Sequence, residues 1–337
     1  MATTFSALPI VDLSPLSKGP KLSVEDRNKL AGELHEVFKT VGFAYLVNPP
    51  LSFSHDDVFG TAKEFFGMPE EEKMCVAKKT FRPANSNTYR GYFPAQLGDD
   101  NLKEGFEVGP TPTPTSARPP LSPFNFTEPN LFPPPDYFPA SSRARCEQLH
   151  TELQSLGSAL LSLLAHALDS PAFDPDMLLQ GSASTLRLLH YPSPPASSTQ
   201  ELSCTPHTDS GLLTLLHQDS TGGLEVLNAA GEWIPAPYVP GSLVVNIGDL
   251  MAQLSGGTYV ATRHRVRVTR GKSRYSVPFF CEPGVDAVVP SPDGVVRYEE
   301  FVLGKMKTWV EFQDLPDDNA EKETWKAEAA NLVSAAA

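Results

Sequence analysis

Residues 186–283 restrict the possible fold more than any other part of the chain, because short apolar runs alternate there with turns. The runs cover residues 186–191, 212–217, 224–227, 242–247, 265–269 and 274–280, and most of the turns between them contain glycine. Runs of this length with alternating polarity predict β-strands. Several such strands at this spacing favour a β-sandwich or a double-sheet barrel.

The first half of the chain predicts helices instead. Residues 23–40 place Leu30, Leu34 and Phe38 at helical spacing behind Ser23, a typical N-cap residue. Further helices are predicted at 56–66, from residue 69 onward, and at 142–168, where leucines form a continuous stripe. Short strands are predicted at 8–13 and 41–47. Helices followed by strands indicate an α+β fold.

Residues 110–139 contain eleven prolines, a density that excludes both a helix and a central strand. We interpret this segment as a covering loop, and the alternative is a lid or wall over an active site.

Composition excludes several classes of function. The formal net charge is -13, so a nucleic-acid partner is not expected. The four cysteines form no CxxC pair, which is typical of a reduced cytoplasmic protein rather than a disulfide or zinc framework. Neither a signal peptide nor a membrane-spanning run is recognisable, so no membrane partner is expected.

The triplet His207-Thr208-Asp209 is the strongest chemical signal. Residues two apart on a strand point to one face, so His207 and Asp209 can reach one ion. An isolated HxD pair is common by chance, but His264 lies in the same strand-rich half and supplies a third ligand. Two histidines and one carboxylate form the open site of non-haem Fe(II) oxygenases, whereas structural zinc sites use four ligands.

Arg274 and Ser276 follow ten residues after His264 and share one strand face. An arginine holds a carboxylate through two parallel hydrogen bonds, and a serine hydroxyl adds a third donor. Tyr191 offers a further hydroxyl, although a structural role is equally compatible with the sequence. We interpret the remaining histidines as structural or solvent-facing; they are His35, His55, His150, His166, His190 and His217.

Together these segments resemble the 2-oxoglutarate/Fe(II)-dependent dioxygenases of the isopenicillin N synthase-like group. The resemblance covers most of the chain, and its motifs are specific in order and spacing. They are LPIVDL at 8–13, GFAYLVN at 42–48, RGY at 90–92, KEGF at 103–106, LRLLHYP at 186–192, HTD at 207–209, NIGD at 246–249, HRV at 264–266 and RYS at 274–276.

The resemblance implies a distorted double-stranded β-helix, or jelly-roll, with flanking helices. It implies that His207, Asp209 and His264 bind Fe(II) and that Arg274, Ser276 and Tyr191 contact 2-oxoglutarate. It also implies oxidation of a C–H bond of a small organic substrate by O2, by hydroxylation, desaturation or ring rearrangement, with release of succinate and CO2. Residues expected to line the substrate pocket are Phe280, Phe106, Tyr89 and Tyr92.

The resemblance also suggests a division of the chain. We expect an N-terminal helical region with short strands and the proline-rich loop at 1–140, the jelly-roll core with its supporting helix at 141–298, and a helical tail at 299–337. We expect a cytoplasmic monomer. One departure from the family is Asn48-Pro49-Pro50, where an Asn-His-Gly sequence is usual.

Two alternatives remain open at this stage. The first is an iron oxidase of the same group that does not use 2-oxoglutarate. The second is a non-catalytic ligand-binding protein on the same fold.

Overall fold

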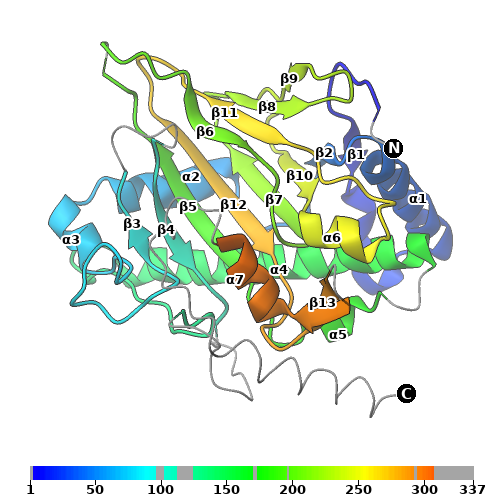
Figure 1. Ribbon diagram of the computed structural model, residues 1–337, viewed down its shortest axis with the longest axis horizontal. Helices are drawn as coiled ribbons and strands as arrows, with labels where there is room; N and C mark the ends of the chain where they lie inside the picture. Colours follow the sequence, from blue (N-terminus) through cyan, green and yellow to red (C-terminus); the bar gives the residue numbers. More distant parts are fainter. Residues whose placement is uncertain are drawn as a thin grey trace.

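Two facing sheets form the centre of the protein in the computed structural model (Figure 1). The structure describes residues 3–95, 102–111, 124–169, 173–195, 197–291 and 294–306. Within these ranges the larger sheet has the strand order β1 (Ile10–Asp12), β2 (Phe43–Val47), β10 (Leu243–Ile247), β7 (Leu213–Gln218), β12 (Arg274–Cys281), β5 (Thr185–Tyr191), β4 (Glu104–Val108) and β3 (Tyr92–Phe93). The smaller sheet has the order β6 (Leu202–His207), β11 (His264–Arg267), β8 (Leu224–Leu227) and β9 (Trp233–Pro235). A separate hairpin pairs β13 (Val288–Ser291) with β14 (Gly294–Arg297).

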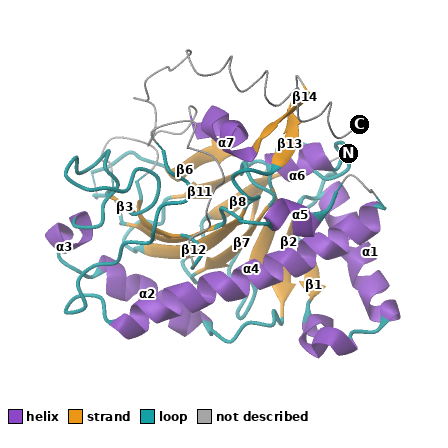
Figure 2. Ribbon diagram, turned by 90° about the horizontal axis from the view of Figure 1, so that it is seen from below, coloured by secondary structure: helices purple, strands orange, loops and turns teal. Residues whose placement is uncertain are grey.

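The helices lie mainly on the outer face of the larger sheet, which points away from the smaller sheet, and α4 crosses its strands there (Figure 2). Their bounds are α1 (Val24–Thr40), α2 (His55–Phe66), α3 (Glu70–Met74), α4 (Ala140–Leu168), α5 (Pro175–Leu179), α6 (Asp249–Leu254) and α7 (Tyr298–Met306), with a 3-10 segment at Ser14–Lys21. The predicted helices at 23–40, 56–66 and 142–168 are confirmed within two residues. The Ser23 side chain accepts a hydrogen bond from the Asp26 N–H, as expected of an N-cap.

The two faces of the larger sheet have different environments. Its outer face packs on the helices: Phe106 of β4 stacks on Phe65 of α2 with ring centroids 4.2 Å apart, and Phe279 of β12 meets His150 of α4 at 5.1 Å. Its inner face points toward the smaller sheet, where Leu189 and Tyr191 share a second apolar cluster with residues such as Val266 of β11. The α+β jelly-roll prediction is confirmed, and the interior between the sheets is the place for a site.

Strands from the first 140 residues form both edges of the larger sheet, because β2 pairs with β10 and β4 pairs with β5. Asn48, which precedes the unusual Pro49-Pro50, follows β2 with a φ of 51°, and its amide donates to an Asp12 carboxylate oxygen at 2.9 Å, which ties the ends of β1 and β2 together. The three-part division of the chain remains a prediction. Residues 112–123 of the proline-rich segment and 307–337 of the tail lie outside the described residues.

The described part of the proline-rich segment has neither helix nor strand before α4 begins at Ala140. It buries Phe124, Phe126 and Phe138 in the core on the helix side of the sheet. Among the described helices, none combines the length and the apolar character that a membrane crossing requires.

His217 of β7 is a buried structural histidine on the outer face. Its ring lies 5.2 Å from that of His55, and neither of its nitrogens has a hydrogen-bond partner. Burial lowers the pKa of His217 to about 3, and the neighbouring His55 adds to the effect. The ring is therefore neutral in the folded protein over most of the pH range in which an exposed histidine becomes protonated.

This environment predicts a pH-dependent stability. The contribution of neutral His217 is fully present above its ordinary pKa of 6.5 and is lost as the pH falls toward 3, because only the unfolded chain takes up the proton there. A His217→Leu variant should therefore gain about 2 kcal/mol relative to wild type near pH 5, and less above pH 7. Urea unfolding across this range measures the effect, and parallel pH profiles for the two proteins would contradict it.

Candidate metal centre

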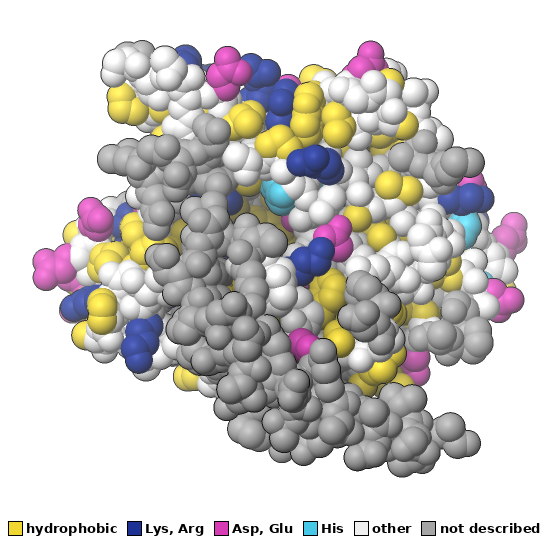
Figure 3. All heavy atoms as spheres, viewed as in Figure 1, with side chains coloured by type: hydrophobic (Ala, Val, Ile, Leu, Met, Phe, Trp, Pro, Cys, Tyr) yellow, Lys and Arg dark blue, Asp and Glu magenta, His cyan; other side chains and the backbone are white. Residues whose placement is uncertain are grey.

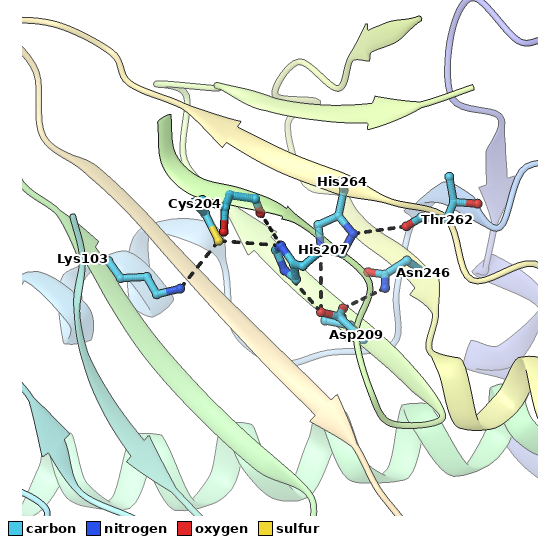
Figure 4. A network of polar contacts seen from close by, with 9 residues as sticks. Lys103, Cys204, His207, Asp209, Asn246, Thr262 and His264 are labelled. Atoms are coloured by element: carbon cyan, nitrogen blue, oxygen red, sulfur yellow. Dashed lines mark hydrogen bonds and ion pairs between the residues drawn. The ribbon is translucent and has the colours of Figure 1, made fainter. Parts of the chain in front are cut away.

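The three predicted metal ligands meet in the space between the sheets (Figure 4). His207 ends β6, and His264 begins β11 directly opposite it in the antiparallel register. Asp209 lies just beyond β6, in the connection to β7. One ligand atom from each of these residues lies within 4.8 Å of the other two. The Asp209 Oδ1 atom is 3.7 Å from Nε2 of each histidine.

Hydrogen bonds orient all three side chains. The Nδ1 atoms of His207 and His264 lie 2.8 and 3.3 Å from the carbonyl oxygens of Thr205 and Thr262. Because a carbonyl oxygen only accepts, each Nδ1 carries a proton, which leaves each Nε2 as the ring atom available to bind an ion. Outer contacts of this kind are typical of metal-binding imidazoles.

The larger sheet holds the carboxylate. The second oxygen of Asp209 accepts hydrogen bonds from Thr214 Oγ1 of β7 at 2.6 Å and from Asn246 Nδ2 of β10 at 2.8 Å. Burial alone would raise the pKa of Asp209, but the two histidines and these two donors hold it below its ordinary value. An ionised carboxylate with one oxygen turned toward two imidazole nitrogens fits a ferrous ion with open positions.

The segment after β10 fixes the backbone of Asp209 as well. The Asp249 N–H donates to the Asp209 carbonyl oxygen at 2.7 Å. Gly248 packs so closely on Gly211 that an added Cβ would collide with its carbonyl group. The NIGD motif at 246–249 therefore positions the predicted ligand Asp209, a role that its place in the sequence did not reveal.

The predicted carboxylate-binding residues also come together. Arg274 lies opposite Tyr191 in the pairing of β12 with β5, and its Cζ atom is 4.7 Å from the Tyr191 ring centroid. Its Nη1 donates to Ser276 Oγ at 3.1 Å, and its Nε donates to the Gly222 carbonyl at 2.8 Å. No carboxylate of the described residues pairs with this buried guanidinium. A buried unpaired cation is costly, so this site suits an anionic ligand.

The predicted substrate pocket needs correction. Phe280 lies on the inner face with Arg274 and Ser276, as expected from alternation along β12. Phe106 and Tyr92 lie on the outer face, where Phe106 stacks on Phe65 and Tyr92 donates to Glu104 at 2.7 Å, so their assignment to the pocket was wrong. The two faces of β4 are both buried, which is why their aromatic character did not reveal the side.

Tyr89 precedes β3 and packs on Phe126 at 4.4 Å in the helix-side core. The other histidines do not join the ligand cluster, which is the only such cluster in the described parts of the chain. His190 contacts a Glu104 oxygen at 2.7 Å and stacks on Tyr275, in agreement with a structural role.

Comparisons with known proteins agree with this geometry. The sequence model of the 2OG-Fe(II) oxygenase superfamily matches residues 182–283, and the model described as "non-haem dioxygenase in morphine synthesis N-terminal" matches residues 8–135. A 2-oxoglutarate-dependent dioxygenase of Didymella fabae is 31% identical, over 90% of this chain and 96% of the relative. The chain belongs to the 2OG-Fe(II) oxygenase superfamily.

Other members of the superfamily extend the comparison. A homoarginine-6-hydroxylase of Oryza sativa is 30% identical over 90% of this chain and 96% of its own length. The crystal structure of a full-length Neurospora crassa protein in complex with alpha-KG superposes with a TM-score of 0.72 at 25% identity, over 88% of this chain and 95% of that protein. This oxygenase is therefore a 2-oxoglutarate-dependent enzyme that uses Fe(II) and O2. Neither alternative left open by the sequence applies, namely an iron oxidase without 2-oxoglutarate or a non-catalytic binding protein.

Asn246 and Thr214 provide a test of the metal centre. Asn246→Ala should weaken Fe(II) binding by about tenfold to a hundredfold, because the Asp209 carboxylate loses a donor that orients it. Thr214→Val removes the other donor at nearly constant volume and should act in the same direction. Anaerobic Fe(II) titration measures both effects, and wild-type affinity in both variants would show that the larger sheet does not position the ligand.

Proposed function

We propose that His207, Asp209 and His264 bind the Fe(II) of this oxygenase. The observation that carries the proposal is the convergence of two imidazole nitrogens and one carboxylate oxygen within 4.8 Å. All three point into the space between the sheets, and their other polar atoms are already engaged by the protein.

We assign the far carboxylate of 2-oxoglutarate to Arg274, Ser276 and Tyr191. The guanidinium is buried, has a serine hydroxyl beside it and is stacked on an aromatic ring, so its planar donors are held in one orientation. When bound, iron and 2-oxoglutarate supply the oxidation of a C–H bond, with succinate and CO2 as co-products.

The protein contributes positioning of the groups that bind iron and 2-oxoglutarate. Asp209 is fixed by donors from β7 and β10, so one oxygen stays turned toward the histidines. The apolar cluster between the sheets includes Leu189, Val226 and Val266, so part of the space between the sheets is lined by nonpolar side chains. A rigid ligand set limits side reactions, because the reacting groups are held in one arrangement.

The substrate that fits these properties is a small organic molecule, hydroxylated or desaturated at an unactivated carbon. On the face shown in Figure 3, the coloured Lys and Arg side chains are scattered among acidic ones and form no continuous basic stripe. With a net charge of -13, this surface disfavours nucleic acid as a partner. We also propose that the enzyme acts as a monomer in the cytoplasm, which gel filtration and fractionation of cells test directly.

The variant Arg274→Gln tests the 2-oxoglutarate contacts independently of the metal ligands. Anaerobic addition of Fe(II) and 2-oxoglutarate to the wild-type enzyme should produce a visible metal-to-ligand charge-transfer band. The variant should need about tenfold to a hundredfold more 2-oxoglutarate to reach the same band, because it loses charge-assisted hydrogen bonds. Its Fe(II) affinity in the absence of 2-oxoglutarate should match wild type, since Arg274 does not touch the triad.

His207→Ala is the complementary variant and should lose the band at every 2-oxoglutarate concentration. Circular dichroism establishes that each variant is folded. If His207→Ala binds Fe(II) as tightly as wild type, the ligand assignment is wrong. If Arg274→Gln leaves the 2-oxoglutarate requirement unchanged, the carboxylate assignment is wrong.

A further inference from the structure

A cavity of about 420 Å3 lies on the outer face of the larger sheet, where α2 begins. Its floor includes His217 of β7 and Leu243 of β10, which are both buried. Its walls come from the connection between β2 and α2 and from the connection between β9 and β10. Cavities of this size are typical of small-molecule sites.

The larger sheet separates this cavity from the metal centre. Thr214 of β7 points to the inner face, where it donates to Asp209. His217 is three residues further along the same strand and points to the opposite face. A molecule in the cavity is therefore bound apart from the iron and 2-oxoglutarate residues.

His217 is the feature that indicates a ligand. Its side chain is 2% exposed, and neither ring nitrogen has a hydrogen-bond partner. Every residue that lines the cavity lies in the described parts of the chain, and His217 is the only one of them whose buried side-chain nitrogens or oxygens are left unpaired. Buried polar groups normally have a partner, and an apolar side chain would avoid the cost of desolvation. Packing alone therefore does not account for an imidazole here.

The neighbouring His55 does not supply the missing partner. Its Nε2 lies 3.0 Å from the Ser242 carbonyl oxygen and therefore carries the proton, so its Nδ1 accepts from the Tyr238 hydroxyl at 3.1 Å. Its ring meets that of His217 edge to face, with centroids 5.2 Å apart. Both nitrogens of His55 are engaged elsewhere, so a partner for His217 has to come from the cavity.

The charges around the cavity favour a neutral ligand. Among the described residues that line it there is no lysine or arginine, and the single carboxylate is that of Asp56, at the exposed rim. Burial lowers the pKa of His217 to about 3 and also lowers the pKa of His55, so both rings are neutral at pH 7. An anion would find no countercharge, and a cation would gain only one exposed ion pair, which is worth little. The side chains of Leu51 and Phe53 offer apolar surface instead.

The wall that contains Pro49 is fixed by local structure. Pro49 lines the cavity and belongs to the Asn48-Pro49-Pro50 sequence, where the chain departs from its family. The Leu51 N–H donates to the Pro49 carbonyl oxygen at 2.8 Å, and a capping box between Ser54 and Asp57 fixes the start of α2. Proline restricts the backbone, so little conformational freedom is lost when a ligand binds.

We propose that this cavity binds a small neutral molecule with an apolar body and a hydroxyl group, and that His217 binds the hydroxyl. A neutral imidazole offers one donor and one acceptor, and a hydroxyl can pair with either. The apolar body packs against Leu51, Phe53 and Leu243. The inference goes beyond the proposed function and does not depend on it, because the cavity lies on the other face of the sheet.

Phenol, toluene and benzoate test the ligand class, because they share one ring and differ in the group attached to it. Each is titrated calorimetrically into the Fe(II) enzyme without oxygen and with saturating 2-oxoglutarate, which occupies Arg274. We expect phenol to bind about fivefold to tenfold more tightly than toluene, and benzoate to bind more weakly than both. The charge-transfer band should keep its wavelength, because phenol lies across the sheet from the metal.

Two variants locate the bound phenol. His217→Leu removes the hydrogen-bonding ring, and the fold is expected to gain stability from this change. It should bind phenol and toluene with equal affinity. Leu51→Trp keeps His217 but fills the cavity from a half-buried position in its wall, and it should bind neither probe.

His35→Leu is the matched control. His35 of α1 also has its Nδ1 atom 3.1 Å from a tyrosine hydroxyl, that of Tyr259, but it does not line the cavity. This variant should keep the wild-type preference for phenol over toluene.

Four results would overturn the inference. They are the absence of phenol binding to the wild-type enzyme, a phenol preference that survives in folded His217→Leu, phenol binding that persists in folded Leu51→Trp, and a shift of the charge-transfer band when phenol is added. The last result would place phenol at the metal centre. A wild-type enzyme that gives no band contradicts the proposed function instead, and the two variants still decide whether the cavity binds phenol.

Discussion

The carboxylate of Asp209 connects the two sheets, and the arrangement of the whole site depends on that connection. The two histidines belong to β6 and β11 of the smaller sheet, whereas the donors to the second carboxylate oxygen belong to β7 and β10 of the larger sheet. The ligand geometry is therefore correct only when the sheets pack in one relative position. Since a register slip of one residue turns every side chain to the opposite face, the pairing of His264 with His207 also fixes the ligands.

The same constraint explains how much of the site could be predicted from the sequence. His207 and Asp209 are close in the chain, and Arg274 and Ser276 share a strand face, so local spacing already places each pair. The motifs of the family then supply the distance in sequence to His264. Thr214 and Asn246 could not be assigned in this way, because their role comes from the pairing of β7 with β10, which brings together residues far apart in the sequence.

Strand β4 shows why the pocket was harder to predict. All five residues of Glu104–Val108 are buried, and each face carries a glutamate, so polarity does not distinguish the inner face from the outer one. The apolar face with Phe106 packs on helix α2, while the face with Gly105 and Glu107 lines the interior of the barrel. The aromatic Phe106 therefore belongs to the helix-side core and not to the inner wall.

The two glutamates of β4 also differ in the groups that surround their carboxylates. Glu104, on the outer face, is held by Lys73, Tyr92 and His190, which enclose its carboxylate in a network within the core. Glu107 is also buried, and its partner Arg187 keeps 18% of its side chain exposed. Buried ion pairs stabilise folded proteins little compared with apolar residues of the same size, because desolvation offsets the attraction. The contact of Arg187 with Phe280 places that cation against β12, the strand that also carries Arg274 and Ser276.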